Sequence, residues 1–166
     1  MASMQERYYR KMEQYKFSLF YWELYLLKSE KMNRRVRIYI AALSVISAAV
    51  WLELDQFKLL WAALITLAQF LNAIYEYLPY GKRTNELGNL IIALTPVYYG
   101  MEKDWFKVAN GSVTETEIHN SLYSHADKWT KKDLEHFKDT SLPQDKKLIG
   151  KADILTNEYF KNMFGE

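Results

Sequence analysis

The chain has 166 residues, with 22 Lys and Arg against 20 Asp and Glu, and it contains no cysteine. A formal charge of +2 argues against broad nucleic-acid binding. The absence of cysteine excludes disulfides, thiolate catalysis and cysteine-ligated metals. Apolar and aromatic residues make up 49% of the chain, a high share for a soluble protein, and this alone does not decide the class.

Residues 1–35 are predicted to form a cytoplasmic amphipathic helix. Six apolar or aromatic side chains recur at spacings of four, three, four, three and four, which places them on one helical stripe. Helix is expected to continue from about Glu6 through Leu54, because no Pro or Gly interrupts this stretch. We expect the stripe to pack on the protein's own helices or on a second subunit, with a lipid surface as the alternative. The stripe consists of Tyr8, Met12, Tyr15, Leu19, Trp22 and Leu26.

Two apolar runs, residues 38–54 and 59–78, are separated by the polar turn at residues 55–58. At about 1.5 Å rise per residue, helices of these lengths span roughly 25 and 30 Å, close to the thickness of a bilayer's hydrocarbon core. The sequence therefore predicts a two-transmembrane hairpin over residues 36–80, with the lipid bilayer as a partner.

The charges around the hairpin predict its orientation. Seven Lys and Arg residues flank the two runs, whereas the turn carries only Lys58. Because short loops rich in basic residues stay on the cytoplasmic side, we expect a multi-pass protein of the bacterial inner membrane with both termini in the cytoplasm. The candidate anchors at the membrane interfaces are Arg34, Arg35, Arg37, Trp51, Trp61, Tyr80, Lys82 and Arg83.

Polar side chains recur at helical spacing inside the hairpin. Lipid cannot satisfy amide groups, so these residues are expected to face other helices or water, which predicts a homo-oligomer. They either join helices through hydrogen bonds or line a pore within the oligomer. The candidate polar stripe consists of Ser44, Ser47, Thr66, Gln69 and Asn72.

Residues 81–166 are predicted to form a cytoplasmic helical domain. Apolar residues at helical spacing over residues 87–108 indicate a helix that Pro96 interrupts. Ser112 and Glu115 have the spacing of a capping box, which predicts the start of the next helix. Since strand-like alternation is missing, the predicted fold class is all-α, with a membrane hairpin between an amphipathic helix and a helical region.

Residues with catalytic or metal-binding potential are few. The histidines are His119, His125 and His136, and their spacings match no two-histidine zinc motif. We expect them to be solvated or to face a partner, and we predict no metal, no cofactor and no catalytic residue. Phosphate-binding loops and nucleophile elbows are also missing from the sequence, so an enzyme is not expected.

The overall organisation resembles a family of known effectors. A cytoplasmic helix that runs through Lys31-Met32-Asn33-Arg34-Arg35 into a short-looped hairpin, followed by further helices, is similar to the small two-transmembrane effectors of bacterial anti-phage systems, the SLATT group. The resemblance implies a membrane protein that permeabilises or depolarises the inner membrane when triggered, in abortive infection. It also implies a regulatory protein or nucleoprotein partner, such as a retron or a nucleotide-signalling component.

Two other functions stay open from the sequence. The hairpin could serve only as the anchor of an adaptor that recruits a cytoplasmic partner, or it could be the core of a soluble helical bundle. Direct sequence-specific binding of nucleic acid is not predicted.

Overall fold

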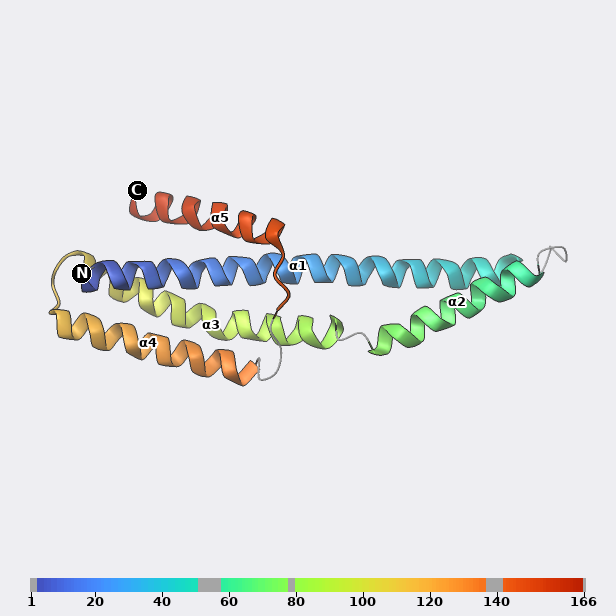
Figure 1. Cartoon of the computed structure of the whole chain (residues 1–166), viewed down its shortest axis with the longest axis horizontal. Coiled ribbons are helices and arrows are strands. Elements are labelled where there is room, and N and C mark those ends of the chain that lie inside the picture. The colour runs from blue at the N-terminus through green and yellow to red at the C-terminus, as the bar shows by residue number, and fades with distance from the viewer. Residues whose placement is uncertain (1–2, 51–57, 78–79, 137–141, 166) are drawn as a thin grey trace. The chain divides into compact units, whose positions relative to one another are not determined.

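The computed structural model describes residues 3–50, 58–77, 80–136 and 142–165, and every regular element in these ranges is an α-helix (Figure 1). Within these ranges, side chains are not described for residues 43–50, 58, 60–61, 71–72, 74–77 and 80–83. The predicted all-α class is confirmed. The helices are α1 (Met4–Val50), α2 (Lys58–Tyr77), α3 (Tyr80–Ala109), α4 (Glu115–His136) and α5 (Lys146–Phe164).

The helices form two compact units. Met1–Leu26 and Asn85–Glu166 form a bundle of the first part of α1 with α3, α4 and α5, called here the bundle unit. Leu27–Thr84 forms the second unit, which contains the rest of α1 and all of α2.

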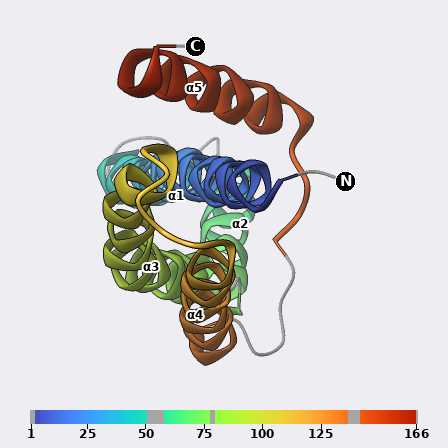
Figure 2. The same ribbon diagram turned by 90° about the vertical axis from the view of Figure 1, so that its left-hand side faces the viewer.

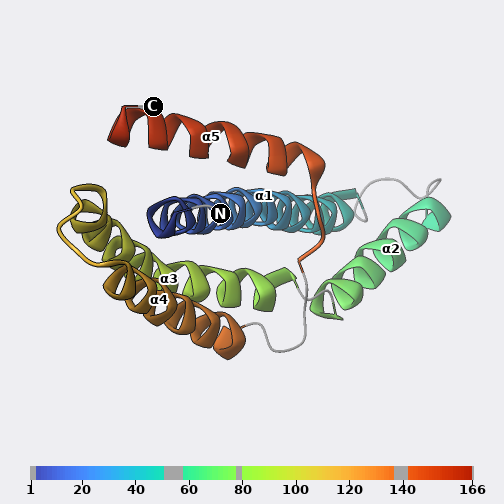
Figure 3. The same cartoon turned by 60° about the vertical axis from the view of Figure 1, so that its left-hand side comes forward.

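The N-terminal stripe of α1 is the centre of the bundle unit. Tyr8 and Met12 are fully buried, and Tyr15 and Leu19 are nearly so. Figures 2 and 3 show α1 between α5 on one side and α3 with α4 on the other. The spacing of four and three residues places these side chains on one face, which contacts the facing helices. Trp22 and Leu26 extend the stripe as partly buried residues packed against the same core.

Helix α3 supplies the opposite wall of this core. Its buried side chains follow the helical period, and the predicted interruption at Pro96 does not occur, because α3 continues through it and the proline lies on the exposed side. The buried residues of α3 are Leu87, Leu90, Ile91, Leu94, Tyr98, Met101 and Val108.

The turn between α3 and α4 differs from the prediction by two residues. The hydroxyl of Thr114, not Ser112, caps α4: it accepts a hydrogen bond from the Glu117 backbone N–H at 3.3 Å, while the Glu117 carboxylate accepts one from the Thr114 N–H at 2.7 Å. The Ser112 hydroxyl instead donates to the Lys107 carbonyl at the end of α3. Two overlapping Ser/Thr-x-x-Glu patterns therefore compete, and the second one forms the capping box.

In the Leu27–Thr84 unit, α1 keeps the same inward face. Ser29 is buried, Asn33, Val36 and Ile40 are half-buried, and each follows the preceding one by three or four residues. On α2, Ala68 is buried. The basic residues of the same stretch of α1 are exposed.

The prediction of a multi-pass protein of the bacterial inner membrane with both termini in the cytoplasm is wrong by the criteria of helix length and apolarity. Among the described residues, no helix combines the length and the apolar character needed to cross a bilayer. Residues 51–57, which include the end of the first predicted run, lie outside the described ranges.

The buried tyrosines predict a loss of stability at alkaline pH. Burial raises the pKa of Tyr8 and of Tyr15 from 10.0 to about 12. The unfolded chain therefore releases these protons first, so stability that is present below pH 10 is lost as the pH rises to 12, by roughly 2–3 kcal/mol for each tyrosine. Tyr15→Phe is expected to lose less stability between pH 10 and pH 12 than the unmodified protein. The measurement is the midpoint of urea unfolding as a function of pH.

The exposed Tyr123 provides the matched control. Tyr123→Phe removes a hydroxyl from a side chain that is 53% exposed, so its pH profile should follow that of the unmodified protein. Equal profiles for Tyr15→Phe and the unmodified protein would contradict the assignment of the alkaline loss to Tyr15.

Candidate functional site

The predicted anchors that the structure describes lie on α1, in the Leu27–Thr84 unit. Arg34, Arg35 and Arg37 are exposed. Arg34 and Arg35 share one helical face with Lys31 and with Ile38, whose exposed fraction is 59%. We call Leu27, Lys31, Arg34, Arg35 and Ile38 the basic-apolar face of α1. The other predicted anchors fall outside the description, as whole residues or as side chains: Trp51, Trp61, Tyr80, Lys82 and Arg83.

Two members of the predicted polar stripe can be placed, and both are exposed on α2. The Thr66 hydroxyl donates to the Ala62 carbonyl of its own helix at 2.7 Å, so it has a partner without any second helix. Gln69 lies on the same side of α2. The side chains of Ser44, Ser47 and Asn72 lie outside the description, so the proposed contact of this stripe with other helices or with water stays a prediction.

Large apolar side chains accompany Thr66 on the outward face of α2. Leu59 is 89% exposed and Phe70 is 60% exposed. They are separated by eleven residues, or about three helical turns, so they lie on nearly the same side as Thr66. This outward face of α2 and the basic-apolar face of α1 are the candidate binding surfaces of the Leu27–Thr84 unit.

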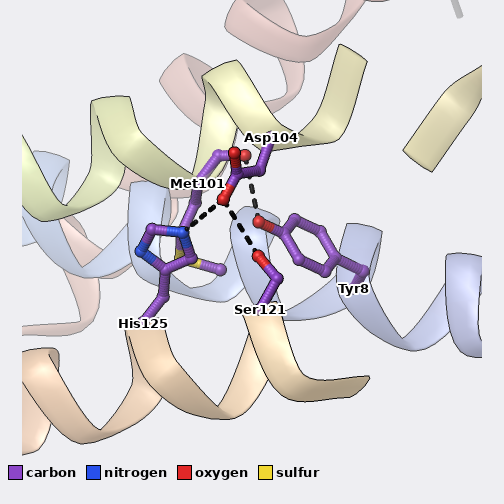
Figure 4. Close-up of polar contacts among 5 residues, drawn as sticks. All are labelled: Tyr8, Met101, Asp104, Ser121 and His125. Carbon is purple, nitrogen blue, oxygen red and sulfur yellow. Dashed lines mark hydrogen bonds and ion pairs between the residues drawn. The ribbon is translucent and has the colours of Figure 1, made fainter. Parts of the chain in front are cut away.

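The bundle unit contains a polar cluster between α3 and α4 (Figure 4). The Asp104 carboxylate accepts hydrogen bonds from the Ser121 hydroxyl at 3.0 Å and from Nε2 of His125 at 2.9 Å through the same oxygen. Beside them, the Tyr8 hydroxyl donates to the Met101 carbonyl at 3.2 Å. The cluster thus connects three helices of the bundle.

Opposing effects act on the Asp104 carboxylate. Partial burial is the largest single effect and favours the protonated acid. The hydrogen bonds from His125 and Ser121, together with the charges of His125 and Lys107, act in the opposite direction. Their sum outweighs burial and lowers the pKa of Asp104 below its usual value. An ionised Asp104 is therefore the form that stabilises the contact between α3 and α4.

The geometry of the cluster favours a structural role over acid-base catalysis. Ser121 and His125 both donate to Asp104 and make no hydrogen bond to each other, so the cluster lacks the serine–histidine hydrogen bond of a catalytic triad. Nδ1 of His125 is buried and has no hydrogen-bond partner, and the ring packs against Gly100. Among the described residues, no group of three His, Cys, Asp or Glu side chains is placed to hold a metal ion.

The expectation that the histidines are solvated or face a partner is wrong for His125. Its exposed fraction is 8%, because the face of α4 that carries Leu122 and Trp129 packs into the bundle and takes His125 with it. The helical spacing of three and four residues to these two side chains was the available signal. His119 is exposed and contacts the Tyr123 ring at 4.4 Å between centroids.

A second cluster surrounds the ammonium group of Lys16. The Nζ atom lies 3.8 Å from the ring centroid of Tyr159, 4.7 Å from that of Tyr98 and 4.9 Å from that of Phe20. The Tyr159 hydroxyl also donates to the Glu102 carboxylate. Burial lowers the pKa of Lys16, and the negative charges of Glu102 and Glu23 oppose that shift. These contacts attach α5 to α1 and α3 through cation–π interactions.

Comparison with known proteins gave no relative: no family model, no curated protein and no solved structure matches this chain.

We predict that Gly100 is required by the close approach of His125. A Cβ atom at this position would lie 3.0 Å from Cε1 of the His125 ring, so Gly100→Ala must displace the ring. The clash should cancel the gain of about 1 kcal/mol that alanine normally gives in a helix interior. Gly150→Ala is the matched control, because nothing lies within 4 Å of its Cβ position. Urea unfolding should show stabilisation for Gly150→Ala alone, and equal stabilisation of both variants would contradict the contact.

We also predict that the Asp104 carboxylate stabilises the bundle. Asp104→Asn removes the charge that accepts hydrogen bonds from His125 and Ser121, which should cost about 1–2 kcal/mol at pH 7. Because the pKa of Asp104 is lowered, its contribution is present above pH 3.8 and is lost as the pH falls through the lowered value. The difference in unfolding free energy between Asp104→Asn and the unmodified protein should therefore become smaller in acid, as measured by urea unfolding.

The control for this experiment is Asp127→Asn on the exposed side of α4. We expect it to change the unfolding free energy by less than about 0.5 kcal/mol at either pH. A similar loss of unfolding free energy in Asp104→Asn and Asp127→Asn would mean that the effect comes from net charge, and it would contradict the stabilising role of the Asp104 cluster.

Proposed function

We propose that this protein is an effector that binds the surface of anionic lipid bilayers through the Leu27–Thr84 unit and disturbs their packing. The observation that supports this proposal is the basic-apolar face of α1, where Lys31, Arg34 and Arg35 are exposed beside the exposed Ile38. Binding at a surface requires no helix that crosses the bilayer.

The chemistry of this face suits an anionic lipid surface. Each Lys or Arg near such a surface contributes about 1 kcal/mol, and apolar side chains add to this by entering the boundary between headgroups and acyl chains. On the adjacent helix α2, Leu59 and Phe70 expose apolar surface that water solvates poorly. Helices that bind lipid surfaces combine basic residues, which stay at the headgroups, with large apolar residues, which enter the boundary with the acyl chains.

The bundle unit is proposed to regulate the lipid-binding unit. The similarity of the helix order to the small anti-phage effectors supports an effector that responds to a trigger and a partner, and the proposed homo-oligomer would concentrate several basic-apolar faces on one membrane. A trigger can shift such a protein only if it binds one of its conformations more tightly than another.

The test is the binding of the full chain to vesicles of phosphatidylcholine with and without phosphatidylglycerol. We expect binding only to the anionic vesicles, with weaker binding at high salt. The double variant Arg34→Gln, Arg35→Gln should bind roughly 30-fold more weakly, since it removes about 2 kcal/mol of attraction. Flotation measures binding, and release of an entrapped dye measures disturbance of the bilayer.

The matched control removes the same charge from the bundle unit. Lys128 and Lys131 are exposed on α4, so Lys128→Gln, Lys131→Gln changes the net charge equally and should leave lipid binding within about twofold of the unmodified protein. Equal loss in both double variants would mean that binding depends only on net charge. Binding without dye release would contradict the effector function and favour an adaptor held at a lipid surface.

A further inference from the structure

We propose that the chain self-associates by pairing α3 with the antiparallel α3 of a second copy, through an exposed stripe formed by Ile92, Tyr99 and Phe106. This stripe, called here the α3 stripe, belongs to the bundle unit and is separate from the proposed lipid-binding surfaces. The inference therefore goes beyond the proposed function and does not depend on it.

The three side chains are large, apolar and exposed. Their exposed fractions are 72% for Ile92, 57% for Tyr99 and 72% for Phe106. They are spaced seven residues apart, which places them within a narrow band along the helix. Single exposed apolar residues are common on proteins, but a regular repeat over two heptads is not scattered exposure.

The stripe is not part of the core of the bundle. The buried side of α3 carries Leu94, Tyr98 and Met101, which pack against the core formed with α1 and α4. The α3 stripe therefore remains outside after the bundle has formed. Helix α3 thus has two contact faces, one used within the chain and one open to a partner.

The sequence positions of the stripe favour a second copy as that partner. Ile92 and Phe106 lie seven residues before and after Tyr99, so the stripe is symmetric about Tyr99. In a two-fold antiparallel pair, Tyr99 meets Tyr99 of the partner subunit, while Ile92 of each copy meets Phe106 of the partner subunit. Two aliphatic-aromatic contacts and one aromatic pair result, and the same surface is used by both copies.

Charge and area are compatible with this pairing. Of the two charged residues near the middle of the stripe, Glu102 is half-buried and accepts a hydrogen bond from Tyr159, and Lys103 is exposed. Two-fold symmetry would separate the two Lys103 positions by about eight residues of helix, or roughly 12 Å, near the screening length in salt. At the exposed fractions given above, the three side chains present on the order of 350 Å² of accessible surface per copy. With their flanking residues, the two copies together would bury about 1,000 Å², the lower limit for a specific interface. A weak dimer with a micromolar dissociation constant is expected.

The absence of cysteine from the chain allows a direct test of this geometry. Tyr99→Cys should cross-link to itself with a short bismaleimide in lipid-free buffer. Ile92→Cys alone should not, since the two copies of this position would lie roughly 21 Å apart, but it should cross-link when mixed with Phe106→Cys. Tyr123→Cys is the control, because Tyr123 has a similar exposed fraction of 53% and lies on α4.

Sedimentation of the full chain over a range of concentrations measures the strength of the pair. Tyr99→Glu places two like charges against each other at the symmetry axis and should raise the dissociation constant at least tenfold, whereas Tyr123→Glu should leave it unchanged. A mixture of Tyr99→Glu and Tyr99→Lys should regain dimers, which shows that neither variant has lost its fold.

Three results would overturn the inference. The first is a monomer at all concentrations together with equal cross-linking of Tyr99→Cys and Tyr123→Cys. The second is efficient self-cross-linking of Ile92→Cys, which would indicate parallel pairing. The third is a larger oligomer that Tyr99→Glu does not weaken, which would place self-association on another surface. None of these results depends on lipid, so they leave the proposed function to its own test.

Discussion

The packing of the α1 stripe into the bundle is the interaction on which the other contacts depend. Tyr8 and Met12 are fully buried, and the residues that surround them come from α3, α4 and α5. Burying a side chain of this size contributes about 1.5–3 kcal/mol, so these residues and their neighbours account for a large part of the stability of a small bundle. Without α1 in place, the apolar faces of the other three helices would have no common partner.

The aromatic residues of α1 also determine how the other helices attach. Tyr15 stacks on Trp129 of α4 with ring centroids 3.9 Å apart and planes inclined by 2°, while Tyr9 contacts Phe160 of α5 edge to face at 5.2 Å. The attachment of α5 also involves polar groups, because the Lys16 ammonium lies over the ring of Tyr159, whose hydroxyl donates to Glu102. Helix α4 is thus attached by ring stacking and the Asp104 cluster in addition to its buried Ile118 and Leu122, and α5 by edge-to-face ring contacts and the Lys16 ammonium group.

Local periodicity was sufficient to predict the helices and the inward face of α1. The spacing from Tyr8 to Leu26 identified the side chains that pack into or against the core, and the predicted continuation of this helix from Glu6 agrees with the start of α1 at Met4. The cap of α4 was misplaced because Ser112 and Thr114 both begin a pattern that ends in Glu, and only the three-dimensional turn selects between them.

The polar clusters could not be predicted in the same way. His125 and Asp104 are 21 residues apart on different helices, so no spacing within one helix relates them. The Lys16 cluster takes its rings from three helices, α1, α3 and α5. Such contacts depend on which helices meet, and this is decided by the sum of core packing rather than by any local pattern. The membrane hairpin is not confirmed, since no helix among the described residues is long and apolar enough to cross a bilayer.

Both units expose large apolar residues. In the bundle unit, Tyr8, Met12, Tyr15 and Leu19 of α1 are buried, and the large exposed apolar residues of α3 form a regular stripe. Among the described side chains of α2, Leu59 and Phe70 are exposed and the small Ala68 is the one that is buried. The proposed binding of a lipid surface would cover Leu59 and Phe70, and a ligand that binds only the folded state raises its stability. The proposed binding would therefore stabilise the Leu27–Thr84 unit, whereas the bundle unit has a core of its own.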